Sequence, residues 1–238
     1  MHIPKCGGQS IETLFLEDLG LDWNSRAPLL LRSNKNPKLG PPRLAHLLAE
    51  EYLRFRYVSE DQFADYFKFS YIRDPYARVI SLFNYLKLKM SLQRFVMEWL
   101  PQQFALAGEY GTYPHEFSGR YHFVRPQSDY IFDANGKLVI DKYYKLEEIK
   151  TNHKDILALL RSEAQLKHVN SSADKTASVT DLDEEMRGLI AELYDIDFKR
   201  LPYDKHGAAK AQKRSDLVTA ESDTPRIDMV EELALETA

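Results

Sequence analysis

The first residues of the chain combine the features that bind a phosphate group. Lys5 precedes a double glycine, Gly7 and Gly8, and Ser10 follows at the start of an amphipathic stretch. Glycines allow the backbone to approach an anion closely, and successive N–H groups at a helix N-terminus then face that anion. The segment that begins at Pro4 therefore predicts a phosphate-binding loop that opens a helix. Its order differs from GxxxxGK[ST], because here the lysine precedes the glycines.

A second segment, residues 69–85, reads FSYIRDPYARVISLFNY. An apolar stretch ends at Arg73, Asp74 can cap the helix that follows, and Pro75 suits the first turn of that helix. Ser81 falls on the polar face of this helix, two turns further on. A guanidinium and a hydroxyl placed in this way can bind one phosphate. The segment therefore predicts a second anion-binding element at a strand-to-helix junction.

The two motifs together resemble those of carbohydrate sulfotransferases, enzymes that use 3′-phosphoadenosine 5′-phosphosulfate (PAPS) and whose loop reads roughly HIPKTGGTS. This chain has Cys6 and Gln9 where threonine is usual. The likeness continues in RPQSDYI, NGKLVID, YKLEEI, HVNSS and LYDIDFKRLPYD, and so extends through Tyr203. The resemblance implies a PAPS donor, a carbohydrate acceptor and no metal ion. No HExxH, CxxC or clustered acidic loop is present in the sequence to suggest one.

The resemblance also implies roles for individual residues. Lys5 would stabilise the charge that develops on the oxygen bridging phosphorus and sulfur, as a loop lysine does in phosphoryl transfer. The 3′-phosphate would be bound by Arg73 and Ser81, with Arg78 a further candidate on the same helix face. The 5′-phosphosulfate would be bound by the loop residues Pro4, Lys5, Cys6, Gly7, Gly8, Gln9 and Ser10.

His46 is the candidate general base, because the unperturbed pKa of histidine suits proton transfer near neutral pH. It stands between the two motifs, in HLLAEEY, and resembles a family pattern, HLTAxEL, apart from Leu48. The alternative interpretation is a structural histidine near a helix start. A later loop holds candidate contacts for an anionic or sugar acceptor, although a loop with two histidines is more often an ordinary loop: His115, Arg120, His122, Arg125 and Gln127.

The two motifs, each at the end of a strand, and the family resemblance imply an α/β fold that is P-loop-like, with three layers and a short, mostly parallel sheet flanked by helices. In the family that the chain resembles, an apolar strand leads into the first loop, and almost all of that strand is absent ahead of His2. This predicts a truncated N-terminal strand and an in-frame apolar stretch of about five or six residues upstream of Met1. The expected elements are helices at 9–19 and 43–55, a strand at 67–72, helical residues 75–107 with breaks at Pro101 and after it, a hairpin at 131–140, a strand at 143–146, and helices at 149–163 and 181–194.

Composition narrows the remaining possibilities. The 238 residues are 44% apolar with a net charge of −4, which fits one globular domain and gives no electrostatic reason to expect a nucleic acid partner. No apolar run reaches the length of a membrane span, and the single cysteine fits a reducing compartment, so a cytoplasmic location is expected for the chain as given. A Golgi anchor or signal upstream stays an open alternative. The domain is expected to span 1–203, and the acidic tail at 204–238, which lacks aromatic residues, is expected to be disordered or loosely helical.

The expected activity is therefore transfer of the sulfuryl group of PAPS to a hydroxyl of a carbohydrate. Two alternatives remain open at this point. One is a nucleotide-binding protein without turnover, which the short first strand and Gln9 suggest. The other is a P-loop-type nucleotide kinase, against which stand the missing GK[ST] pattern and the pair formed by Arg73 and Ser81.

Overall fold

A computed structural model describes residues 1–108, 120–160 and 176–206, and the chain from Met1 to Lys205 forms one compact unit. Three sequence-based expectations lie outside the described residues. These are the acceptor contact at His115, the HVNSS likeness at 168–172, and the character of the tail beyond residue 206.

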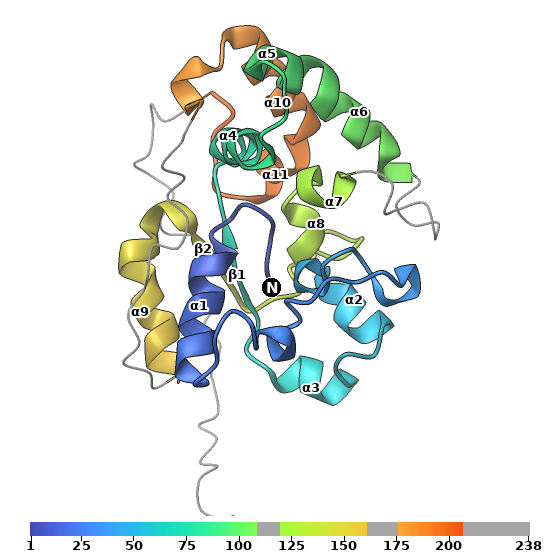
Figure 1. Cartoon of the computed structure of the whole chain (residues 1–238), viewed down its shortest axis with the longest axis vertical. Helices are drawn as coiled ribbons and strands as arrows, with labels where there is room; N and C mark the ends of the chain where they lie inside the picture. Colours follow the sequence, from blue (N-terminus) through green and yellow to red (C-terminus); the bar gives the residue numbers. More distant parts are fainter. Residues whose placement is uncertain (109–119, 161–175, 207–238) are drawn as a thin grey trace, which may run out of the picture. The chain divides into compact units, whose positions relative to one another are not determined.

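The centre of the unit is a two-stranded parallel sheet, as the predicted α/β class requires. β1 (Phe69–Ile72) pairs with β2 (Lys142–Lys145), with Phe69 opposite Lys142 and Ile72 opposite Lys145. Helices α1 (Gly8–Asp18) and α9 (Ile149–Leu160) lie on one side of the sheet and α2 (Ala49–Arg54) on the other (Figure 1). Ser70 and Ile72 on one face of β1, and Tyr71 on the other, are all buried, as is usual for parallel strands. The layered arrangement places the end of β1 deep within the unit.

The first residues of the chain lie beside β1. The amino group of Met1 donates to the carbonyl oxygen of Phe69 at 2.7 Å, and the hydroxyl of Ser70 donates to the carbonyl oxygen of Met1 at 3.0 Å. Residues 1–3 form no assigned strand. They lead directly into the loop that contains Lys5, so both predicted anion-binding motifs begin at the same end of the sheet.

Residues 43–55 do not form the single helix that their pattern predicts. A 3-10 turn (Leu44–His46) is followed by extended backbone at Leu47 and Leu48, and only then by α2. The Glu51 carboxylate accepts the backbone N–H of Leu48 at 2.8 Å, which fixes the start of α2 after the break. The break leaves His46 in a buried turn and not on a helix face. A short helix, α3 (Glu60–Asp65), capped by Ser59, then leads to β1.

A largely helical region follows β1, and its first break comes earlier than predicted. α4 (Pro75–Leu86) ends at Lys87, which adopts a left-handed conformation with φ 47°. Pro101 was expected to break the helix, but it lies in the first turn of α6 (Leu100–Ala105), where a missing N–H is tolerated. Between α4 and α6 lie α5 (Leu92–Arg94) and a π-helix (Phe95–Trp99).

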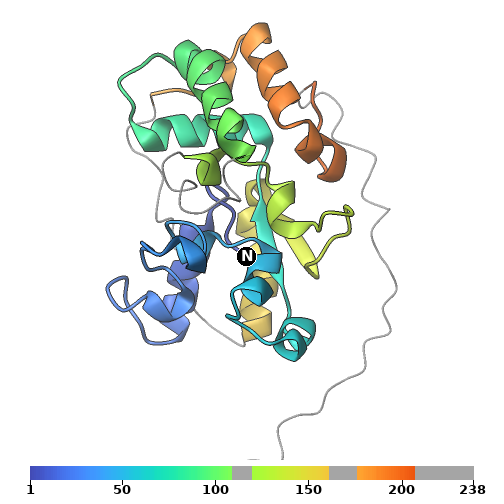
Figure 2. The same cartoon turned by 90° about the vertical axis from the view of Figure 1, so that its right-hand side faces the viewer.

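The remaining elements complete the described part of the chain. The hairpin predicted at 131–140 keeps its turn, with Gly136 at φ 80°, but its strands reduce to one antiparallel bridge between Phe132 and Leu138. Figure 2 shows α4, α5 and α6 gathered at one end of the unit, together with α10 and α11. The helices not yet given are α7 (Tyr121–Val124), α8 (Ser128–Ile131), α10 (Glu184–Leu193) and α11 (Asp195–Arg200). Short 3-10 turns occur at Ala27–Leu29, Pro37–Leu39, Leu106–Gly108, Leu146–Glu148 and Val179–Asp181.

Candidate anion-binding and transfer site

The loop from Ile3 to Ser10 is a tight turn that opens α1. The N–H of Cys6 donates to the carbonyl oxygen of Ile3 at 3.2 Å, and the N–H of Ser10 donates to that of Gly7 at 3.0 Å. Gly7 has φ 79°, and a Cβ there would collide with the side chain of Leu146, so the position requires glycine. Gly7 is also the N-cap of α1 and offers no side chain to the first N–H groups of the helix. The loop therefore presents a helix N-terminus without a capping side chain, which suits an anion.

Arg73 brings the second motif into contact with the first. It follows the last residue of β1, and its Nη1 donates to the carbonyl oxygen of Lys5 at 3.2 Å. The next residue, Asp74, caps α4 by accepting the N–H of Ala77 at 2.9 Å, as the sequence predicts. The backbone N–H of Asp74 donates to Glu147 at 2.9 Å. Two loops that are 68 residues apart in the chain therefore meet, with Arg73 in contact with Lys5.

One face of α4 lies against the phosphate loop. Arg78 is 2% exposed, and its three nitrogens donate to the carbonyl oxygens of Pro4, Arg125 and Phe123 at 3.0–3.1 Å. Arg78 thus holds the loop in place, and the structure gives it this role instead of the phosphate contact that its sequence position suggested. Ser81, three residues later, is half-buried on the same helix face.

Lys5 points toward α4 as well. Its Nζ lies 3.8 Å from the centre of the Tyr85 ring, which stands one turn after Ser81 and is 51% exposed. Burial lowers the pKa of Lys5 to about 8, and the positive charge of Arg73 contributes in the same direction. Lys5 is also in the left-handed region, with φ 68°, which is unfavourable for a residue with a side chain. A bound anion would relieve the electrostatic part of this unfavourable arrangement.

His46 is held beneath the loop by His2. Its Nδ1 donates to the carbonyl oxygen of His2 at 3.0 Å, so the lone pair of the neutral ring resides on Nε2. Burial, followed by the neighbouring His2, lowers the pKa of His46 well below its usual 6.5, and the side chain is 8% exposed. Two aromatic rings lie between His46 and Lys5, the other predicted catalytic residue. The centre of the His46 ring is 6.2 Å from that of Phe123, and the centre of the Phe123 ring is 6.1 Å from that of Tyr85, the ring that Lys5 contacts.

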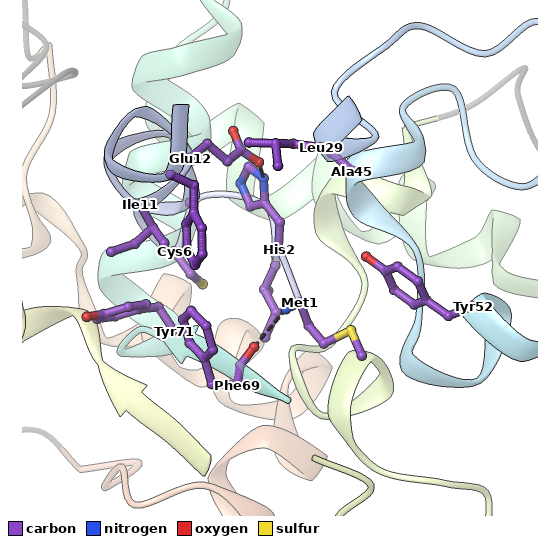
Figure 3. Close-up of a pocket in the computed structure, with 13 residues that line it drawn as sticks. Met1, His2, Cys6, Ile11, Glu12, Leu29, Ala45, Tyr52, Phe69 and Tyr71 are labelled. Atoms are coloured by element: carbon purple, nitrogen blue, oxygen red, sulfur yellow. Dashed lines mark hydrogen bonds and ion pairs between the residues drawn. The ribbon is translucent and has the colours of Figure 1, made fainter. Parts of the chain in front are cut away.

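A cavity of about 220 Å³ lies next to this loop but does not include Lys5 or Arg73. Figure 3 shows His2 reaching from the first residues toward Glu12, whose carboxylate its Nδ1 contacts. The imidazole of His2 occupies the space that a Cβ on Gly8 would need. The other lining residues are mainly apolar and include Phe69 and Tyr71 of β1. The cavity therefore shares Cys6 and Gly8 with the predicted phosphate loop but excludes Lys5 and Arg73, and His2 forms part of its wall.

Gln127 differs most from its sequence interpretation. The sequence offered it as a contact for an acceptor, but it is fully buried and binds residues of both phosphate motifs. Nothing in the local pattern identifies this role, because the partners are distant in the chain. His122 is also buried, and burial lowers its pKa to about 4.

The fold is α/β, and the two loops predicted to bind anions lie at one end of its parallel sheet. The model of the sulfotransferase family matches residues 1–204, and the chain belongs to that family. Comparisons with curated proteins and with solved structures gave no match. Within residues 1–108, 120–160 and 176–206, no helix is long and apolar enough to cross a membrane. The same residues contain no cluster of three or more His, Cys, Asp or Glu suited to a metal ion.

Proposed function

We propose that the chain transfers the sulfuryl group of PAPS to a hydroxyl of a carbohydrate. Membership of the sulfotransferase family supports the reaction class. The observation that carries the choice of donor is the contact between Arg73 and the carbonyl oxygen of Lys5. It places a guanidinium against the glycine loop, so two anionic groups of one nucleotide can be bound side by side.

The donor fits the residues that surround this contact. A guanidinium has five N–H donors, so one bond to Lys5 leaves Arg73 able to bind a phosphate, with the hydroxyl of Ser81 as its partner. We assign the 5′-phosphosulfate to the N-terminus of α1, because no side chain caps the first N–H groups of this helix. Replacement of threonine by Cys6 or Gln9 keeps the backbone donors of the loop. The donor-binding residues in this proposal are Pro4, Lys5, Cys6, Gly7, Gly8, Gln9, Ser10, Arg73 and Ser81.

The chemistry requires an attack on sulfur in line with the departing oxygen. The acceptor hydroxyl forms the new S–O bond while the bond from sulfur to the bridging oxygen of the nucleotide breaks. His46 takes the hydroxyl proton on Nε2, the nitrogen that its contact with His2 leaves unprotonated. Lys5, protonated, stabilises the negative charge on the departing phosphate oxygen. The products are a sulfate ester and 3′,5′-adenosine bisphosphate.

An exposed aromatic ring next to Lys5 supports a carbohydrate acceptor. Tyr85 lies within 3.8 Å of the Lys5 ammonium, and about half of its surface is exposed. Aromatic rings combine a large apolar face with a polar edge, which suits a sugar ring that has both kinds of surface. The acceptor hydroxyl would then lie near the sulfur, beside Lys5.

A transfer assay tests this proposal. The protein is incubated with radiolabelled PAPS and a panel of desulfated glycosaminoglycans, and label in the glycan is counted. We expect transfer by the wild type and by Lys89→Ala, a control at an exposed lysine just beyond α4. Transfer should fall strongly in Lys5→Ala and roughly a hundredfold in His46→Ala. Nucleotide binding without transfer to any acceptor would favour a binding protein, and phosphate transfer from ATP with magnesium would favour a kinase.

A further inference from the structure

The side chain of Gln127 joins the two anion-binding motifs from inside the protein. Its Oε1 accepts the backbone N–H of Arg73 at 2.8 Å and the thiol of Cys6 at 3.1 Å. Its Nε2 donates to the carbonyl oxygen of Arg73 at 2.7 Å and to Asp197 at 3.4 Å. One carboxamide thus binds both backbone groups of the arginine and a residue of the glycine loop.

The groups around Gln127 keep this arrangement fixed. Asp197 is fully buried and accepts the backbone N–H groups of Gln127 and Ser128 at 2.9 and 2.8 Å, which anchors the start of α8. Burial raises the pKa of Cys6 to about 12, so the thiol stays protonated and remains a donor to Oε1. Gln127 itself is 0% exposed and has no direct access to a ligand.

Arg73 depends on this support because of its place in the chain. The ladder between β1 and β2 ends at Ile72, so no strand pairing fixes the backbone of the next residue. Gln127 replaces that pairing on both the N–H and the C=O of Arg73. The direction of the guanidinium toward Lys5 follows from this backbone position.

We propose that Gln127 is a positioning residue that makes the two motifs act as one site, and that its loss selectively weakens recognition of a 3′-phosphate. This inference rests on the proposed function, because it assumes that Arg73 binds the 3′-phosphate of the donor product. The effect is selective for the 3′-phosphate because of what Gln127 contacts. Gln127 controls the backbone of Arg73 directly, whereas it contacts the glycine loop only through the Cys6 thiol.

The test compares two nucleotides by calorimetric titration of the full chain. One is 3′,5′-adenosine bisphosphate, the other is 5′-AMP, and the ratio of their affinities measures recognition of the 3′-phosphate. Gln127→Ala should lower this ratio by about tenfold, the scale of one charge-assisted hydrogen bond, and Gln127→Asn should do the same if the alanine variant does not fold. After Arg73→Ala, the further change Gln127→Ala should leave the ratio unchanged.

Asn84 provides a matched control for the loss of a buried amide. It is 7% exposed, donates to the carbonyl oxygen of Ala177 at 2.9 Å, and accepts two N–H groups and a hydroxyl from residues 176 and 177. Asn84→Ala should lower the thermal midpoint but keep the wild-type ratio. An unchanged ratio in a folded Gln127 variant, or an equal fall in Asn84→Ala, overturns the positioning role alone. A wild type that does not prefer the bisphosphate overturns the proposed donor site as well, so the two failures are distinguishable.

Discussion

Replacing Lys5 by methionine should stabilise the protein while it abolishes the activity. The pKa of Lys5 falls from 10.5 to about 8 on folding, chiefly through burial. Since one pKa unit corresponds to about 1.4 kcal/mol, the charge on Lys5 lowers the free energy of unfolding by about 3 kcal/mol at neutral pH. Loss of the contact with Tyr85 offsets about 0.5–1 kcal/mol of the gain. We expect Lys5→Met to be more stable by about 2 kcal/mol at pH about 7.

The stability gained by Lys5→Met should depend on pH. Between pH 8 and 10.5 the unfolded chain retains the Lys5 proton and the folded chain has lost it, so the wild type becomes more stable as the pH rises. Urea unfolding followed by circular dichroism, at pH about 7 and about 9.5, should show the advantage of Lys5→Met largely disappearing at the higher pH. Lys89→Met, at an exposed position, should match the wild type at both. A Lys5→Met protein no more stable than the wild type at neutral pH would refute this reasoning.

Three further predictions concern binding and rate. Arg73→Ala or Ser81→Ala should weaken calorimetric binding of the bisphosphate nucleotide by about 1–3 kcal/mol, and unchanged affinity in both would remove the pair from the site. His46→Ala should lower the turnover number roughly a hundredfold with little change in nucleotide affinity, and wild-type turnover would exclude it as the base. In the enzyme without substrate the pKa of Lys5 is about 8, and Lys5 must be protonated to act. The value of kcat/KM for PAPS should therefore fall above that pH, and this fall should be absent in an active Lys5→Arg variant.

The local features of the fold were predictable from sequence because their causes are local. Glycines before an apolar periodicity predict the start of α1, and Asp74 followed by proline predicts the start of α4. The α/β class followed from the same signals. The break at Leu47–Leu48 was not predictable, because the pattern of apolar residues continues through it and a side chain of the next turn, Glu51, stabilises the extended backbone.

The contacts between segments could not be predicted in the same way. Arg78 and Ser81 look equivalent on one helix face, yet the carbonyl oxygens that bind Arg78 come from residues 4, 123 and 125. The role of Gln127 likewise depends on partners at positions 6, 73 and 197. A single sequence gives the donors and acceptors of a site but not their pairing, which follows from how the sheet brings its loops together.

The central claim is that the two motifs form one site for a nucleotide with phosphates at both the 3′ and 5′ positions. Calorimetric titration with 3′,5′-adenosine bisphosphate in the absence of magnesium tests it most directly. The wild type should bind this nucleotide without the metal, and Arg73→Ala should bind it more weakly. Tight, magnesium-dependent binding of ATP with no response to the bisphosphate would contradict the claim.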